Sequence, residues 1–74
     1  MSDTLISMDY RFVDILNADQ LEVDDLIGWD SEVVKIILIQ PTKTGLLLTI
    51  ENDFSEKYEI EINDDEKFEL YILA

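Results

Sequence analysis

Asp and Glu are the most numerous ionisable residues in this chain. Near the C-terminus they alternate with apolar residues. Glu59 and Glu61 take every second position of the segment from Lys57 to Ile62, and an acidic run follows at 63–66. Alternate side chains of a β-strand share one face and lie about 6.6 Å apart. Carboxylates spaced in this way could stand in for the phosphates of a nucleic acid. The expected partner-binding acidic face comprises Glu51, Asp53, Glu59, Glu61, Asp64, Asp65, Glu66 and Glu69.

Catalysis and metal binding lack the residues that they need. The chain has no His and no Cys, the side chains that most often serve as catalytic base and as activated nucleophile. The pair Asp24-Asp25 and the run 63–66 are rich in oxygen. A calcium loop, however, supplies about six to eight oxygens at fixed spacing, usually around a glycine. We therefore expect no enzymatic activity, no dedicated metal site and no cofactor.

The charge balance restricts the class of partner. Eighteen Asp and Glu residues stand against five Lys and Arg, which gives a net charge of -13 over 74 residues. Binding to phosphate groups requires cations that this chain does not carry, so nucleic acid and anionic membranes are excluded as direct ligands. A basic protein is the expected partner. The acidity could instead serve only the solubility of a marginally stable β-protein, and the sequence leaves both explanations open.

Length and hydropathy indicate one folded domain spanning 1–74. Hydrophobic residues make up 47% of the chain, which is too many for a disordered acidic tail. No apolar run approaches the roughly 20 residues of a membrane span, and the start of the chain lacks the basic-then-apolar pattern of a signal peptide. We expect a cytoplasmic protein. Without disulfides or zinc, its stability must come from sheet closure, packing or oligomerisation.

The elements that must position the acidic face are expected to be β-strands. Three β-branched segments are separated by turn-like residues at 41–45 and 53–56, which predicts a meander. Alternation near the start predicts a strand over 5–13, although Leu5, Met8, Phe12 and Leu16 also have the spacing of a helix. After it, either Asn17 caps a single helical turn or Asp19 forms a turn. A short strand should end at Gly28. The remaining expected strands are Val33–Gln40, Leu46–Asn52, Lys57–Ile62 and Phe68–Leu73.

An open sheet of these strands would leave one apolar face exposed to water and the backbone groups of its two edge strands unpaired. We therefore predict an all-β fold, a small SH3-like barrel of about five antiparallel strands over 17–74 with an additional N-terminal strand or arm within 1–16. Side-chain alternation assigns the inward positions. The expected core comprises Leu26, Ile27, Val34, Ile36, Leu38, Leu46, Leu48, Ile50, Tyr58, Ile60, Ile62, Phe68, Leu70 and Ile72.

Strand register follows from matching the apolar faces of neighbouring segments. In the second hairpin, Leu48 should face Ile60, with Ile50 opposite Tyr58 and Leu46 opposite Ile62. In the first hairpin, Leu38 should face Leu46, with Ile36 opposite Leu48 and Val34 opposite Ile50. This arrangement leaves an outward apolar spot, which either the N-terminal arm or a second subunit in a homodimer should cover. The expected apolar interface comprises Met8, Tyr10, Phe12, Ile37, Ile39 and Leu47.

Four stretches carry a resemblance to a known class of barrels. They read LEVDDLI at 21–27, EVVKIILI at 32–39, GLLLTIEN at 45–52 and KFELYIL at 67–73. Over about 18–73 the chain resembles the small SH3-like β-barrel proteins of tailed phages. More remotely it resembles the first domain of elongation factor P and the KOW-type barrels. The resemblance implies the barrel fold and a phage origin, but the basic residues with which the translation relatives contact RNA are absent.

Two functions remain open from the sequence. The first is a non-enzymatic inhibitor that occupies the basic groove of a nucleic-acid-handling host protein, by DNA mimicry, in the host cytoplasm if the protein is phage-encoded. The second is a structural or assembly module that uses apolar residues such as Tyr10, Phe12, Ile37 and Leu47. Binding to the inhibitor's target should weaken as salt rises, whereas binding through the apolar residues should not.

Overall fold

The structure is a computed structural model of the 74-residue chain and describes residues 10–73. Within this range the fold is all-β, as predicted, with one short 3-10 turn and no α-helix. No helix in the described range is long and apolar enough to cross a membrane. The elements are β2 (Tyr10–Asn17), η1 (Ala18–Gln20), β3 (Leu26–Trp29), β4 (Glu32–Pro41), β5 (Gly45–Glu51), β6 (Lys57–Asn63) and β7 (Lys67–Leu73).

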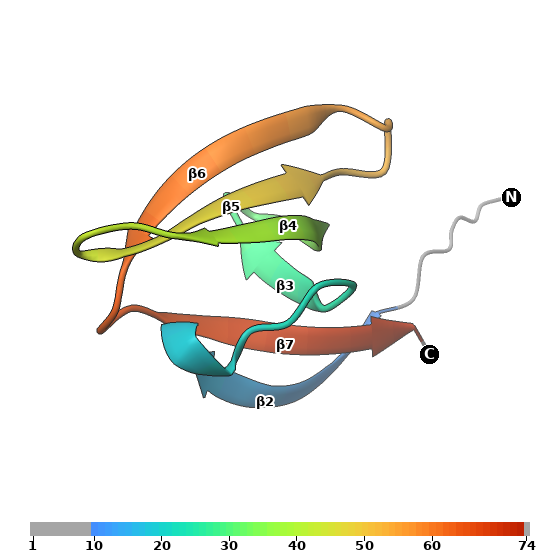
Figure 1. The fold of residues 1–74 in the computed structure, drawn as a ribbon. Helices are drawn as coiled ribbons and strands as arrows, with labels where there is room; N and C mark the ends of the chain where they lie inside the picture. The colour runs from blue at the N-terminus through green and yellow to red at the C-terminus, as the bar shows by residue number, and fades with distance from the viewer. Residues whose placement is uncertain (1–9, 74) are drawn as a thin grey trace, which may run out of the picture.

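The six strands form one antiparallel sheet in the order β2-β7-β3-β4-β5-β6. The sheet curls: β5 and β6 lie above β7 and β2, with β3 and β4 between them (Figure 1). The curl brings Trp29 of β3 to 6.3 Å from Tyr58 of β6, measured between ring centroids, although two strands separate β3 from β6. Among residues 10–73, β2 and β6 are the terminal strands and do not pair with each other. The predicted closure into a barrel is therefore not observed.

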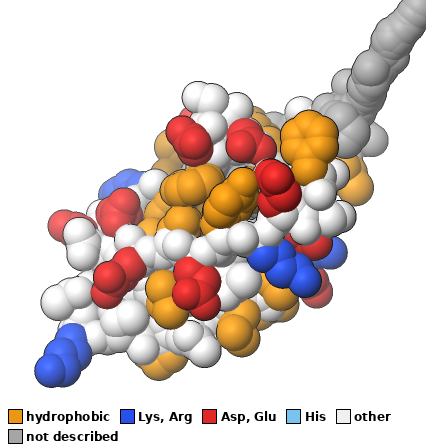
Figure 2. Space-filling model, turned by 90° about the horizontal axis from the view of Figure 1, so that it is seen from above, with side chains coloured by type: hydrophobic (Ala, Val, Ile, Leu, Met, Phe, Trp, Pro, Cys, Tyr) orange, Lys and Arg blue, Asp and Glu red, His pale blue; other side chains and the backbone are white. Residues whose placement is uncertain are grey.

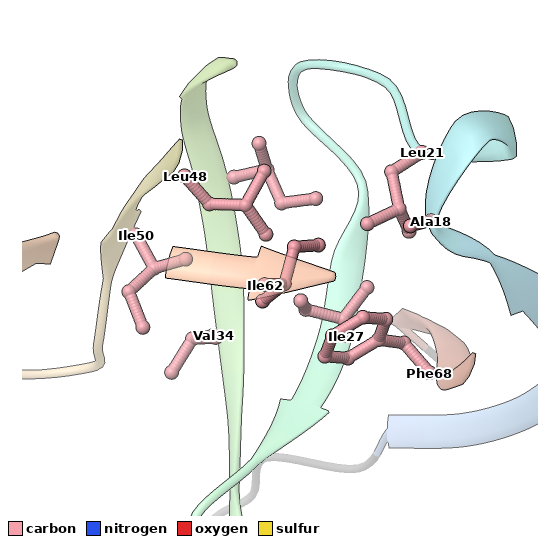
Figure 3. Packing of buried hydrophobic residues seen from close by; sticks show 9 residues of the cluster. Ala18, Leu21, Ile27, Val34, Leu48, Ile50, Ile62 and Phe68 are labelled. Carbon is pink, nitrogen blue, oxygen red and sulfur yellow. The ribbon is translucent and has the colours of Figure 1, made fainter. Parts of the chain in front are cut away.

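The hydrophobic core fills the concave side of the curled sheet. Figure 3 shows its side chains converging from the strands and from the segment around η1. Burying a side chain the size of Leu or Ile contributes about 1.5–3 kcal/mol, so these residues dominate the stability of a domain this small. The buried hydrophobic residues are Ala18, Leu21, Ile27, Val34, Ile36, Leu48, Ile50, Ile62 and Phe68.

The predicted core was only partly correct. Leu38, Tyr58 and Ile72 were expected inside but are 46%, 42% and 40% exposed. Ala18 and Leu21 were not expected in the core and are buried there. Ala18 begins η1 and Leu21 follows it, and the backbone N–H of Ala18 donates to the Glu66 carbonyl at 3.1 Å, which fixes this segment over the end of the sheet. Strand alternation gives no information about such a connecting segment.

The hairpin of β5 and β6 has the predicted register. Leu46 lies opposite Ile62, Leu48 opposite Ile60 and Ile50 opposite Tyr58. Gly45 begins β5 where the backbones come closest, since a Cβ added there would lie 1.9 Å from the Ile62 carbonyl oxygen. The residue at this position must therefore be glycine.

The hairpin of β4 and β5 departs from the predicted register. Ile36 lies opposite Ile50 instead of the predicted Leu48, a slip of two residues. The ladder then shifts by one further residue between Ile36 and Leu38, so that Ile39 lies opposite Leu48. A β-bulge of this kind adds one residue to one strand and reverses the alternation beyond it. As a result Leu38 points outward beside Thr49, and Ile39 packs against the core. The expected outward position of Ile39 was wrong.

The N-terminal strand extends further along the chain than expected. The prediction placed a strand at 5–13; residues 10–13 of that range lie in β2, which continues to Asn17 and pairs with β7. The single helical turn expected after Asn17 is present, and the Asn17 backbone N–H donates to Gln20 Oε1 at 2.9 Å. Residues 1–9, including Met8 of the expected interface, lie outside the described residues.

Candidate functional site

The structure divides the predicted acidic face into separate groups. Glu59 and Glu61 point outward from β6, opposite Thr49 and Leu47, and the β6–β7 turn continues this group with further exposed carboxylates. Figure 2 looks down on the molecule from the β6 side and shows acidic side chains on both sides of a cluster of hydrophobic ones. We call this group the β6 row; it comprises Glu59, Glu61, Asp64, Asp65 and Glu66.

Within the β6 row, Glu66 stabilises the β6–β7 turn through hydrogen bonds. Its Oε2 accepts a hydrogen bond from the Asn63 backbone N–H at 2.7 Å, and its own N–H donates to the Asn63 carbonyl. The backbone of Asp64 is anchored to the neighbouring hairpin through Thr44. These bonds hold the turn in shape and leave the side chains of Asp64 and Asp65 exposed.

Glu51 contributes less negative potential than the sequence suggested. Its Cα lies opposite Lys35 on β4 and opposite Lys57 on β6. Cross-strand neighbours on one face lie about 4.5–5.5 Å apart at Cβ, so opposite charges at these positions attract. The outer face of the sheet is therefore close to neutral along this line, and Glu51 is the weakest member of the predicted set.

Two adjoining clefts gather the remaining carboxylates. Their volumes are about 420 and 590 Å³, and Tyr10 and Val33 line both. Six carboxylate side chains and one ammonium group line the pair of clefts. The carboxylates are Asp24, Asp30, Glu32, Glu51, Asp53 and Glu69, and the ammonium group belongs to Lys35. Lys35 Nζ lies 3.9 Å from Asp24 Oδ1.

Tyr10 connects the two ends of the sheet across these clefts. Its hydroxyl donates to Asp53 Oδ1 at 3.0 Å, which links the start of β2 to the β5–β6 loop. Partial burial, followed by the bond to Asp53 and the charge of that carboxylate, raises the pKa of Tyr10 above its ordinary value. The sequence placed Tyr10 in an apolar interface, but in the structure its polar end serves an intramolecular contact.

The β5–β6 loop that carries Asp53 is held in one shape by Asn52. Oδ1 of this buried side chain accepts from the backbone N–H groups of Phe54 and Glu56, at 2.9 and 3.0 Å. Its Nδ2 donates to Glu56 Oε1 at 2.9 Å, and the Tyr58 hydroxyl donates to the same oxygen at 3.0 Å. Both bonds lower the pKa of Glu56, and the bond to Glu56, followed by the charge of that carboxylate, raises the pKa of Tyr58. The loop therefore presents its carboxylates in a fixed arrangement.

The larger cleft combines aromatic rings with carboxylates. The Tyr71 hydroxyl donates to Glu69 Oε1 at 2.6 Å, and this bond raises the pKa of Tyr71. Both side chains lie over Gly28, where an added Cβ would meet Tyr71 Cε2 at 3.3 Å and Glu69 Oε1 at 3.4 Å. Trp29 completes the aromatic lining. Aromatic faces beside carboxylates favour organic cations such as the guanidinium of Arg.

The expected apolar interface is dispersed. Tyr10 and Phe12 lie on β2 at one end of the strand order, whereas Ile37 and Leu47 lie on β4 and β5. The strand β2 pairs with β7 and therefore does not cover the spot around Leu47. Ile37 and Leu47 are half-buried, and Leu38 is the exposed residue there.

Three carboxylates of the clefts were missed by the sequence argument. Asp24 and Asp30 sit in turns with positive φ, 78° and 52°, and Glu32 begins β4. Asp and Asn tolerate this conformation better than most residues, so their presence indicated turns. Nothing in the sequence indicated that these turns meet the β5–β6 loop, because that proximity results from the curl of the sheet.

No group of three or more His, Cys, Asp or Glu side chains suited to hold a metal ion is found among residues 10–73. The clefts are lined by carboxylates and aromatic rings. Comparison with known proteins adds no further assignment. No protein-family model matches the chain, and no curated protein or solved structure matches it either.

Proposed function

We propose that this chain is a non-enzymatic acidic protein that binds a basic protein partner, with the paired clefts receiving Arg or Lys side chains. The observation that supports it is the lining of those clefts, six carboxylates against one ammonium group around aromatic side chains. A cation placed there gains charge attraction together with contact to aromatic faces. A neutral or acidic ligand gains neither the charge attraction nor the cation–aromatic contact.

Several contacts are needed for useful affinity. An exposed ion pair contributes only about 0.2–1 kcal/mol, so a single Arg in a cleft would bind weakly. Charge complementarity over a whole surface acts mainly through faster association and through rejection of like-charged proteins. A net charge of -13 suits a partner that presents an extended basic surface.

Proteins that handle nucleic acid present such a surface, and we propose that this chain inhibits one by occupying its groove. Duplex DNA carries one charge per about 1.7 Å of axis, so thirteen charges correspond to roughly 22 Å of duplex. The β6 row would then extend the acidic surface beyond the clefts. A phage origin, action in the host cytoplasm and membership of the SH3-like barrels belong to this proposal. The meander of β4, β5 and β6 and the curl of the sheet support the last point.

Affinity capture from a bacterial lysate with matched baits tests the proposal. The cleft variant carries Glu32→Gln, Asp53→Asn and Glu69→Gln. The row variant carries Glu59→Gln, Glu61→Gln and Asp65→Asn, so both lose two Glu and one Asp charge. The wild-type chain should retain a basic nucleic-acid-handling protein, and the cleft variant should lose most of it. Moderate salt should elute the captured protein.

The alternative, an assembly module, predicts different results from the same baits. Capture would then survive high salt and both sets of substitutions, and the captured protein would be a structural component. The exposed hydrophobic side chains Phe12 and Leu73 favour contact with some protein surface. Loss of capture in a Phe12→Ser variant, with the cleft variant unaffected, would support assembly instead of inhibition.

A further inference from the structure

Exposed hydrophobic side chains are concentrated on β2 and β7. Residues 10–73 contain nine large hydrophobic side chains that are exposed, and five of them lie on these two strands. The strand β2 contributes little to the core, since Leu16 alone of its residues packs against it. Figure 1 shows β2 and β7 together at the lower side of the molecule. The five residues are Phe12, Val13, Ile15, Ile72 and Leu73.

The same two strands are electrically neutral. They carry Arg11 and Lys67 against Asp14 and Glu69, two positive and two negative charges. The whole chain has a net charge of -13, so a second copy that approached another surface would meet carboxylates. A neutral pair of strands with exposed apolar side chains is the part of a strongly acidic protein where a second copy meets the least repulsion. A basic partner, by contrast, gains no charge attraction there.

Within residues 10–73, β2 is an edge strand of the sheet. One edge of β2 pairs with β7, and no strand within 10–73 occupies the outer edge. An open edge presents unpaired backbone N–H and C=O groups, which can extend the sheet by pairing with another chain. A second copy of β2 would satisfy these groups on both molecules at once.

A bulge in β2 gives this edge a self-complementary sequence. The register with β7 shifts between Phe12 and Asp14, so that Arg11 lies opposite Ile72 and Asp14 opposite Leu70. Ile72 and Leu70 are two residues apart on β7 and share a face. Arg11 and Asp14 therefore share a face as well, although they are three residues apart. In a regular strand this spacing would place them on opposite faces.

We propose that two copies of this chain pair antiparallel through their β2 edges, about a two-fold axis between Phe12 and Val13. In this register Arg11 of each copy lies opposite Asp14 of the other, and Phe12 lies opposite Val13. Both copies keep the same face of the sheet on the same side, as a two-fold axis normal to the sheet requires. The proposed dimer does not depend on the proposed function.

Pairing has two costs. Asp14 Oδ1 accepts a hydrogen bond from the Ile15 backbone N–H at 2.7 Å, so the carboxylate must share its oxygens between that group and Arg11 of the second copy. Each copy also brings a net charge of -13. We therefore expect a dimer that forms at micromolar rather than nanomolar concentration, and one that tightens when salt screens the overall repulsion.

A charge-swap cycle tests the register. Sedimentation equilibrium of the full chain from about 1 to about 200 µM should show a monomer–dimer equilibrium. Arg11→Asp and Asp14→Arg should each weaken the dimer on the order of tenfold, because symmetry replaces two attractions by two repulsions. The double variant restores opposite charges and should recover dimerisation to within about threefold. Circular dichroism of each variant checks that the strands remain folded.

Disulfide trapping tests the same register independently, since the chain has no cysteine of its own. A mixture of an Arg11→Cys variant with an Asp14→Cys variant should form a covalent heterodimer, because opposed Cα atoms fall within the reach of a disulfide. Either variant alone places its two cysteines about 8 Å apart at Cα, because the bulge leaves them two ladder positions apart along the strand and on neighbouring strands, which is too far. Each variant alone therefore serves as the control.

The possible results of these experiments either support the proposed dimer or overturn it. Concentration-dependent dimers, rescue by the double variant and selective cross-linking of the mixture support the proposal. A monomer up to about 200 µM would overturn it. A dimer whose dissociation constant is unchanged by both charge reversals would also overturn it. So would cross-linking of Arg11→Cys with itself as efficiently as with Asp14→Cys. None of these results depends on whether the clefts bind cations.

Discussion

Truncation of Asn52 to Ala should destabilise the fold and loosen the wall of the clefts. The side chain is buried and makes three hydrogen bonds, to the backbone N–H groups of Phe54 and Glu56 and to Glu56 Oε1. An intramolecular hydrogen bond contributes about 0.5–1.5 kcal/mol net. Because the Glu56 carboxylate is fully exposed and water can replace its bond, we count only the two backbone bonds. The expected loss is about 1–3 kcal/mol in the free energy of unfolding.

Urea denaturation followed by Trp29 fluorescence measures this loss. The midpoint should fall while the slope stays constant, which marks a change of stability without a change in the surface exposed on unfolding. Asn52→Asp keeps both acceptor bonds but places a second carboxylate beside Glu56, so it should lie between wild type and Ala. Asn63→Ala, an exposed amide on β6, is the matched control and should stay within about 0.5 kcal/mol of wild type. An Asn52→Ala variant as stable as this control would refute the role assigned to the loop.

Three further predictions concern the core, the tyrosines and salt. Leu48→Ala in the buried core should cost about 2–5 kcal/mol and unfold most of the population, measurable by far-ultraviolet circular dichroism. Tyr10, Tyr58 and Tyr71 should ionise above the ordinary pKa of 10.0, seen by absorbance titration. Because their folded pKa values are raised, the associated stability is present below pH 10 and should be lost as pH rises through the folded values. Raising NaCl from about 0.05 to about 0.5 M should weaken binding of a basic partner and tighten the proposed dimer, as sedimentation at both concentrations would show.

Alternation of apolar residues located most strands because it reflects a local property of the chain. The register of β5 and β6 was predictable, because one pairing places apolar side chains together on one face of the hairpin and polar ones mainly on the other. Gly45 also permits the close approach of the two backbones at the start of β5. The register of β4 was not predictable. Ile36 lies opposite Ile50 instead of Leu48, and a slip of two residues keeps the same side chains on the same face, so side-chain alternation cannot distinguish the two registers. The bulge then adds one residue between Ile36 and Leu38, and nothing in a run of apolar β-branched residues shows where alternation will reset.

The candidate site was predictable in its chemistry but only partly in its location. Net charge alone predicts a basic partner, and three residues of the expected acidic face, Glu51, Asp53 and Glu69, line the clefts. The grouping of these residues with Asp30 and Glu32 depends on contacts between loops that are distant in sequence. Such contacts follow from the curl of the sheet, which no local pattern encodes.

Titration of the isotope-labelled chain with a peptide of about ten arginines tests cation binding at the clefts directly. Backbone amide shifts should concentrate around Glu32, Asp53 and Glu69, and the cleft variant should bind at least about tenfold more weakly than the row variant, although both have lost three charges. Equal weakening of the two variants, with shifts spread over the whole acidic surface, would show that only the overall charge attracts the peptide. A larger loss in the row variant would contradict the clefts as the binding site and favour the β6 row.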